Sequence, residues 1–194
     1  TPGGGALPGG VGWYRKTFVP EKKFEGKNAF IQFDGVYMNS EVWVNGTYLG
    51  KRPFGYISFE YNLTPFLVFG QENTVTVKVD NSQQPNSRWY TGSGIYRNVR
   101  IVYTHRSYIP IWGTYVTTPS ITKSKATVQI QTKIINASGK AMSIRTSIID
   151  EEKNLINAAC TEFNNYENTL LQAIEVSKPI LWSPSTPYLY TVKS

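Results

Sequence analysis

The sequence predicts an all-β protein, and three observations support this. Aromatic residues make up 14% of the 194 residues and include 13 tyrosines. Segments in which apolar and polar residues alternate follow one another along the chain, and Gly, Pro or Asn stands between them. No segment shows a convincing helical period. Aromatic and β-branched side chains with alternating polarity are typical of half-buried strands, so a chain of strands joined by turns is expected.

The first two strands are expected at 12–20 and 28–36. The first, GWYRKTFVP, alternates around Trp13 and Arg15 and ends at Pro20, which cannot donate a hydrogen bond to a sheet ladder. The second, NAFIQFDGV, is an apolar run in which Asp34-Gly35 supplies a turn.

A hairpin is expected over 40–52. Val42 and Val44 alternate with Trp43, and Asn45-Gly46 follows directly. Asn-Gly is the preferred pair for a type I′ turn, because both central residues need positive φ. A further alternating segment, 57–67, stops near Pro65.

The segment 73–81 carries the clearest strand pattern of the chain. Three valines occupy one face, and Thr76, Lys78 and Asp80 occupy the other. Asp80 stands on the polar face where the strand ends and a long loop begins, and binding groups concentrate in such loops. One more strand is expected at 96–104.

Sequence character changes after residue 107. Pro110 and Pro119 bracket a segment interpreted as a connector, and strands with few aromatics follow at 126–136, 142–150 and 168–176. We therefore divide the chain into domains 1–107 and 108–194. The strand spacing of the second domain is typical of an immunoglobulin-like β-sandwich. A strand is still running at Ser194, so this sandwich is expected to be truncated at its C-terminus.

Composition argues against several classes of function. The formal charge is +7, with 12 basic and 7 acidic residues in 1–107 and 8 and 6 in 108–194, so positive charge has no dense focus and nucleic acid is not an expected partner. There is no run of about 18 apolar residues, and a membrane is not expected either. Cys160 and His105 are the single cysteine and histidine, which excludes intrachain disulfides and the usual zinc sites and Ser-His triads.

Acidic residues are few and scattered in the first domain. Retaining glycosidases need two carboxyl groups about 5 Å apart, and no motif here pairs one acid with another. Aromatic residues near the end of the domain, Trp89, Tyr90 and Tyr96, are interpreted mostly as packing groups around the Gly92-Ser93-Gly94 turn.

Four stretches, GVGWYRKTF, FDGVYMNSEVWVNGTYLGKRPFGYISFEYNLTPFL, NTVTVKVDN and SRWYTGSGIYRNVRI, together resemble the N-terminal domain of glycoside hydrolase family 2 enzymes. LWSPSTPYLYTV resembles the end of the immunoglobulin-like domain that follows it in that family. The wording RWYTGSGIYR is most similar to bacterial β-galactosidases. The resemblance covers nearly the whole chain.

The resemblance implies a galactose-binding-like jelly roll over 1–107, then the immunoglobulin-like sandwich, then a catalytic TIM barrel downstream with two glutamates. It implies that the parent protein hydrolyses β-glycosides with retention, and that this chain is a non-catalytic fragment with no catalytic pair. The expected partners are a β-galactoside or related carbohydrate and the downstream barrel. Family β-galactosidases bind Mg²⁺ or Na⁺ mostly through barrel residues, so no cofactor or metal site is expected in this chain.

The resemblance also implies a substrate-binding set. In the family, the loop that follows the strand matching VKVDN reaches over the active site, and its acidic residue helps to hold the terminal sugar. This role transfers to Asp80, with Asn81 beside it. Arg88 and Trp89 match the RW pair before the Gly-Ser-Gly turn and are expected to shape the edge of the pocket.

Two other functions stay open at this point. One is an autonomous carbohydrate-binding module. The other is a pair of scaffold domains that contact a second copy in a homo-oligomer, since exposed sheet edges permit such pairing. The compartment is unknown from the sequence; a bacterial periplasm is favoured over the cytoplasm.

Overall fold

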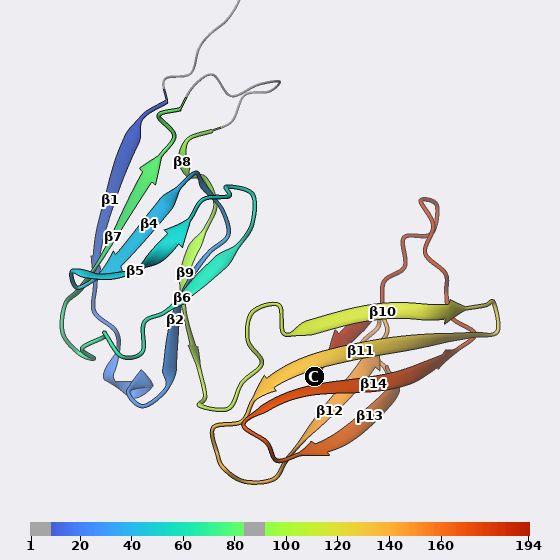
Figure 1. The fold of residues 1–194 in the computed structure, drawn as a ribbon. Helices are drawn as coiled ribbons and strands as arrows, with labels where there is room; N and C mark the ends of the chain where they lie inside the picture. The colour runs from blue at the N-terminus through green and yellow to red at the C-terminus, as the bar shows by residue number, and fades with distance from the viewer. Residues whose placement is uncertain (1–8, 84–91) are drawn as a thin grey trace, which may run out of the picture. The chain divides into compact units, whose positions relative to one another are not determined.

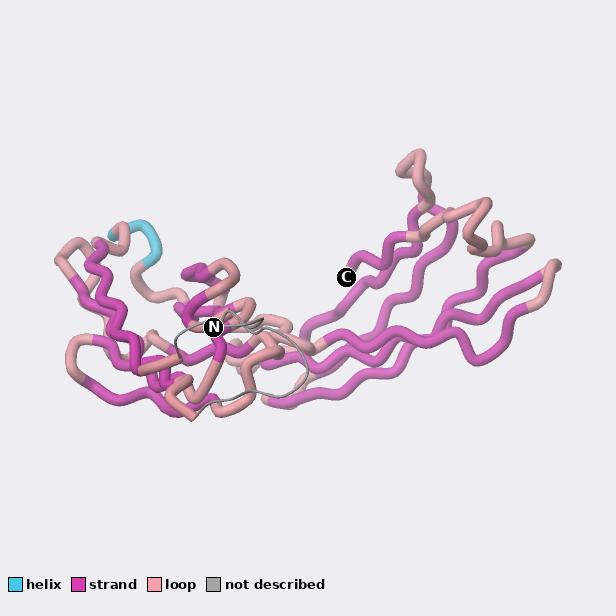
Figure 2. The backbone as a smooth tube through the Cα atoms, turned by 90° about the horizontal axis from the view of Figure 1, so that it is seen from above, coloured by secondary structure: helices cyan, strands magenta, loops and turns pink. Residues whose placement is uncertain are grey.

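A computed structural model describes residues 9–83 and 92–194 of the chain. The chain divides into two compact units, the first ending at His105 and the second comprising Arg106–Ser194 (Figure 1). Apart from a single 3-10 turn at Lys22–Phe24, the regular structure of the described residues is β-strand (Figure 2). The all-β prediction is confirmed.

The first unit is a sandwich of two antiparallel sheets with a short third pairing. One sheet has the strand order β1-β7-β4-β5, the second β6-β2-β9, and β3 pairs with β8. The strands are β1 Val11–Phe18, β2 Asn28–Phe33, β3 Val36–Tyr37, β4 Ser40–Val44, β5 Thr47–Arg52, β6 Phe59–Asn62, β7 Asn73–Asp80, β8 Gly94–Ile95 and β9 Val99–Thr104. This arrangement is consistent with the jelly roll predicted from the sequence.

The core of the first unit lies between these two sheets. The alternation predicted for 73–81 is confirmed, because Val75, Val77 and Val79 are buried while their neighbours on β7 are half-buried. They pack in one cluster with Phe33 and Phe59 of the opposite sheet, whose rings stack with centroids 4.9 Å apart. Each such side chain contributes about 1.5–3 kcal/mol by leaving water.

The hairpin predicted at 40–52 is also confirmed. β4 and β5 pair antiparallel, and both turn residues have positive φ, 48° at Asn45 and 82° at Gly46. Asn45 also ties the turn to the rest of the sheet: its amide nitrogen donates to the Phe66 carbonyl at 2.9 Å, and its oxygen accepts from the Thr74 amide at 2.8 Å. Its side chain is therefore engaged in fixing the fold.

The second unit consists of two three-stranded antiparallel sheets, with orders β10-β11-β14 and β13-β12-β15 (Figure 1). The strands are β10 Thr114–Ile121, β11 Lys125–Ile135, β12 Met142–Ile149, β13 Leu155–Phe163, β14 Glu167–Ser177 and β15 Thr191–Lys193. Sheet on sheet is the architecture of an immunoglobulin-like sandwich, in agreement with the predicted class.

The interior of the second unit has two apolar clusters. Ile130, Ile148, Ile174 and Val176 form one, and Ile134, Ile144 and Phe163 form the other. Buried polar groups accompany them: Gln172 donates from Nε2 to Thr161 Oγ1 at 3.1 Å, whereas buried Thr132 Oγ1 has no hydrogen-bond partner within the described residues.

One sequence interpretation of this unit is wrong. The segment bracketed by Pro110 and Pro119 is not only a connector, since it contains strand β10. Pro119 is tolerated there because β10 is an edge strand and its pairing with β11 shifts register between Thr117 and Ser120. The pattern of β13 was also missed, because this edge strand buries only Phe163 and so lacks regular alternation.

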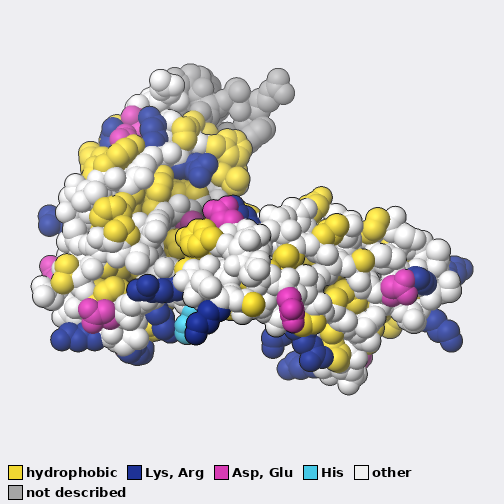
Figure 3. Space-filling view, turned by 60° about the horizontal axis from the view of Figure 1, so that its bottom comes forward, with side chains coloured by type: hydrophobic (Ala, Val, Ile, Leu, Met, Phe, Trp, Pro, Cys, Tyr) yellow, Lys and Arg dark blue, Asp and Glu magenta, His cyan; other side chains and the backbone are white. Residues whose placement is uncertain are grey.

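The surface carries charges of both signs. On the face shown in Figure 3, Lys and Arg side chains lie in several separate groups, with acidic and hydrophobic side chains among them. Among the described residues, no helix has the length and apolar character needed to span a bilayer.

Candidate functional site

The end of β7 is the part of the first unit to which the sequence assigned binding residues. Asp80 is the last residue of the strand and is half-buried. Because side chains alternate along a strand, it lies on the outer face with Lys78 and Thr76, while Val79 points into the core. The strand thus presents a carboxylate where the chain leaves the sheet.

Ser82 holds the Asp80 carboxylate in place. The Ser82 hydroxyl donates to Asp80 Oδ1 at 2.6 Å, and the Ser82 amide donates to the same oxygen at 3.0 Å. These two hydrogen bonds are the main cause that lowers the pKa of the Asp80 carboxyl; desolvation opposes them to a smaller extent, and the charges of Lys78 and Lys51 lower the pKa a little further. Asp80 Oδ2 accepts no hydrogen bond from any other residue that the structure describes.

The backbone of Asp80 is anchored to the segment before β4. Its amide donates to the Met38 carbonyl at 3.0 Å, and its carbonyl accepts from Asn39 Nδ2 at 3.1 Å. Asn39 adopts a φ of 47°, a conformation that asparagine tolerates better than most residues. The sequence analysis missed Asn39, although an Asn-Ser pair directly before a strand is a turn signal that points to it.

Asn81 is buried, with only 2% of its surface exposed. Its amide donates to the Gly10 carbonyl at 2.9 Å, and its side-chain Nδ2 donates to Ser93 Oγ at 2.7 Å. The side chain therefore connects the end of β7 to the Gly92-Ser93-Gly94 turn.

The same turn is fitted closely to β1 and β3. Gly94 has a φ of 99°, and a Cβ at this position would collide with the Tyr14 hydroxyl. Tyr96 lies against Gly35 and donates from its hydroxyl to the Gly55 carbonyl at 2.8 Å. Only glycine is compatible with both the conformation and the approach at position 94.

A pocket of about 240 Å³ lies beside this turn. Residues 9–12 line it together with Tyr14, Val79, Ser93 and Gly94. Two polar groups of this lining, the Gly10 carbonyl and Ser93 Oγ, already accept hydrogen bonds from Asn81.

The structure brings together two of the four predicted substrate-binding residues. Asp80 and Asn81 are consecutive at the end of β7, one with its carboxylate outward and one with its amide buried. Arg88 and Trp89 lie outside the described residues. Within residues 9–83 and 92–194, no group of three or more His, Cys, Asp or Glu side chains is arranged to hold a metal ion.

Comparison with known protein families decides the relationship of the chain. The sugar-binding domain of glycosyl hydrolases family 2 matches residues 7–105, and a second model of glycosyl hydrolases family 2 matches residues 109–194. The chain belongs to glycosyl hydrolase family 2. The resemblance inferred from the sequence motifs is therefore confirmed.

Relatives within the family include enzymes of two named activities. A β-galactosidase of Bacteroides ovatus is 48% identical over 98% of this chain, and a β-glucuronidase of Formosa agariphila is 33% identical over 95%. Among solved structures, a β-glycosidase from Bacteroides vulgatus has 41% identity and a TM-score of 0.88 over 96% of this chain, which is 24% of that protein. The family 2 chain described here spans 23% and 21% of the length of the two curated relatives.

Proposed function

We propose that this chain is the non-catalytic part of a larger retaining β-glycosidase that acts on β-galactosides, and that the end of β7 contributes to the rim of its active site. The proposed catalytic barrel lies in the same parent protein. Membership of family 2, the 48% identity to a β-galactosidase and the small share of each relative that the chain spans all support this proposal.

One observation carries the role of Asp80. Both hydrogen bonds from Ser82 go to Oδ1, and among the described residues none goes to Oδ2. The first oxygen fixes the orientation of the carboxylate, and the second retains its capacity to accept hydrogen bonds from sugar hydroxyls. Asn81 then acts as a positioning residue, because its bond to Ser93 determines how the chain leaves β7.

The substrates of the two activities named for the relatives differ in charge, because a glucuronide carries a carboxylate and a galactoside is neutral. A carboxyl whose pKa is lowered is ionised at neutral pH. An ionised Asp80 at the rim would repel the carboxylate of a glucuronide, whereas it accepts hydrogen bonds from the neutral hydroxyls of a galactoside. The proposal therefore favours a neutral galactoside as substrate.

The proposal is tested by substituting Asp80→Asn in the full-length protein and measuring kcat/KM on a nitrophenyl β-galactoside and the corresponding β-glucuronide. We expect kcat/KM for the galactoside to fall at least about tenfold, and the ratio of glucuronide to galactoside hydrolysis to rise. Asp150→Asn is a matched control, because Asp150 also accepts hydrogen bonds within a turn, from Asn154 at 2.6 and 3.0 Å. Equal activity of wild type and Asp80→Asn would refute the rim role.

A further inference from the structure

The outer face of the β1-β7-β4-β5 sheet carries a row of three aromatic side chains. Trp13 of β1 stacks on Trp43 of β4, with ring centroids 5.5 Å apart and an interplanar angle of 30°. The ring of Trp43 in turn lies against that of Tyr48 on β5, with the two ring centroids 5.4 Å apart. The intervening strand β7 places Thr76 opposite Trp43, and its small side chain lets the two indoles meet across it.

Cross-strand stacking explains only part of this row. Pairs of aromatic side chains stabilise sheets through one ring face. Trp13 nevertheless keeps 62% of its surface exposed, and Tyr48 keeps 50%. A single exposed apolar side chain is ordinary, but aromatic rings that are both contiguous and exposed form a patch of the kind that marks a binding surface.

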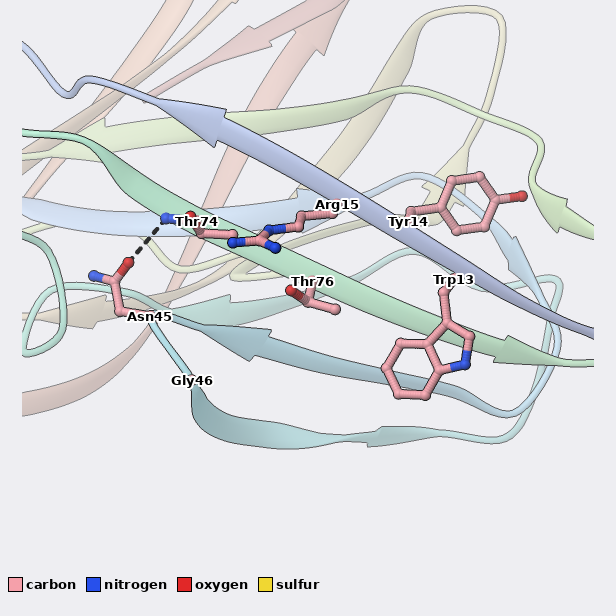
Figure 4. A pocket seen from close by; sticks show the side chains of 7 residues that line it. All are labelled: Trp13, Tyr14, Arg15, Asn45, Gly46, Thr74 and Thr76. Carbon is pink, nitrogen blue, oxygen red and sulfur yellow. Dashed lines mark hydrogen bonds between the residues drawn. The ribbon is translucent and has the colours of Figure 1, made fainter.

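A groove of about 540 Å³ adjoins Trp13 on this face, within the range of volumes found for small-ligand sites. Figure 4 shows Arg15, Thr76 and Trp13 on the same side of the sheet, whereas Tyr14 points to the opposite side. Trp13 and Arg15 are two residues apart on one strand, so their Cα atoms are separated by roughly 6.6 Å along it.

Polar groups in the groove differ in whether their bonding capacity is already used. Asn45 is saturated as a donor, because its Nδ2 bonds both the Phe66 carbonyl and Asn73 Oδ1. Among the described residues, the guanidinium of Arg15 and the hydroxyl of Thr76 have no ion pair or side-chain hydrogen bond. These two side chains remain able to bind a ligand.

Charge at the groove is unbalanced. Lys78, which lies opposite Trp13 on β7, forms an ion pair with Glu41 at 3.3 Å, so its charge is balanced. Among the described residues that line the groove, Arg15 carries the single charge and none is acidic. A ligand complementary to this surface has an apolar ring face for Trp13, hydroxyls for Thr76 and an anionic group for Arg15.

We propose that this groove binds a saccharide that carries a uronate, with a pyranose ring against Trp13 and its carboxylate bound by Arg15. The site is separate from the end of β7, and it does not depend on the proposed role of Asp80. It gives the first unit a means of holding the enzyme on an acidic glycan while another part of the glycan is hydrolysed.

Calorimetric titration of the 194-residue chain tests the proposal, with trigalacturonate and its fully methyl-esterified form as probes. The two ligands share rings and linkages and differ in charge. We expect the acid to bind with a dissociation constant below about 1 mM and the ester about tenfold more weakly. Added salt weakens binding of the acid only.

Two variants separate the contributions. Trp13→Ala is expected to raise the dissociation constants of both ligands about tenfold. Arg15→Gln is expected to abolish the difference in affinity between the acid and the ester. Trp182→Ala and Arg145→Gln serve as controls, because they remove an exposed tryptophan and an exposed arginine from the second unit. The side chains of Trp13 and Arg15 are also exposed and do not support the core. Trp13→Ala and Arg15→Gln are therefore expected to retain the circular dichroism spectrum of the wild type.

Three results would overturn the proposal: no binding of either ligand by the wild type, equal affinity for acid and ester, or unchanged affinity in Trp13→Ala. A change in molar mass of Trp13→Ala in light scattering would also count against it, because the aromatic row would then be a contact between copies. Loss of galactosidase activity in Asp80→Asn leaves the outcome of these titrations unaffected, so the two proposals fail separately.

Discussion

Substitution of Gly94 provides the sharpest test of how the turn beside Asp80 is built. The residue has a φ of 99°, and an added Cβ would collide with the hydroxyl of Tyr14. Its neighbour Ser93 accepts the hydrogen bond that holds Asn81. Gly94→Ala therefore strains the backbone and displaces a side chain at the same position.

The expected cost follows from these two contacts. A side chain at this φ costs about 1–2 kcal/mol. Moving Tyr14 out of its rotamer adds about 0.5–1.5 kcal/mol. The free energy of unfolding of the first unit should therefore fall by about 1.5–3.5 kcal/mol. In the double variant Gly94→Ala/Tyr14→Phe the colliding oxygen is absent, so we expect the second contribution to be recovered and only the backbone cost to remain.

Urea denaturation followed by near-UV circular dichroism measures these differences, with the transition of each unit fitted separately. Gly92→Ala is the matched control in the same turn, because a Cβ there meets no atom within 4 Å and its φ is not in the left-handed region. It should change stability by less than about 0.5 kcal/mol. Equal losses in the two alanine variants, or no recovery in the double variant, would show that the reasoning is wrong.

Three further predictions concern other contacts. Thr132→Val should stabilise the second unit by about 1 kcal/mol in a thermal melt, because the buried Thr132 hydroxyl has no partner among the described residues. Thr146→Val should destabilise the same unit, because the Thr146 hydroxyl is hydrogen-bonded to Ser194 at 2.8 Å. A change of the same sign in both variants would contradict this reasoning. Asp80 has a lowered pKa in the folded state, so its stabilising contribution is complete above its unfolded pKa of about 3.9 and is lost as the pH falls through the folded value. The stability difference between wild type and Asp80→Asn should accordingly shrink on acidification, and a difference constant with pH would exclude the cause given. Asn45→Ala should lower the free energy of unfolding by about 2–4 kcal/mol in urea denaturation, because it removes hydrogen bonds to two backbone groups and a residue suited to positive φ. The control Asn62→Ala removes one exposed hydrogen bond. If Asn45→Ala lowered the stability no more than Asn62→Ala, the structural role given to Asn45 would be wrong.

Local patterns predicted most of the fold. The alternation of three valines with polar residues specified which face of β7 is buried, and Asn45-Gly46 specified the hairpin between β4 and β5. Both signals act between residues close in sequence, where backbone sterics and side-chain periodicity decide the outcome.

Strand β10 was not predicted, and the physical reason is its position at the edge of a sheet. Pro119 is a reliable breaker only in a central strand, where each amide must donate to a neighbour. β10 has a neighbour on one side only, and its register shift accommodates the proline. Whether a strand lies at an edge depends on the order of strands in the sheet, which is a property of the whole unit.

In the candidate site, too, local features were predictable from the sequence and contacts between distant residues were not. The sequence by itself determined that the chain is all-β, that it carries the motifs of family 2, and that a carboxylate stands where β7 ends. Only the tertiary structure showed that Asn81 is buried against Ser93, that Gly94 makes room for Tyr14, and that Trp13 and Trp43 form one surface. Each of these contacts joins residues at least 12 positions apart, and such contacts arise only when sheet order and register bring distant strands together.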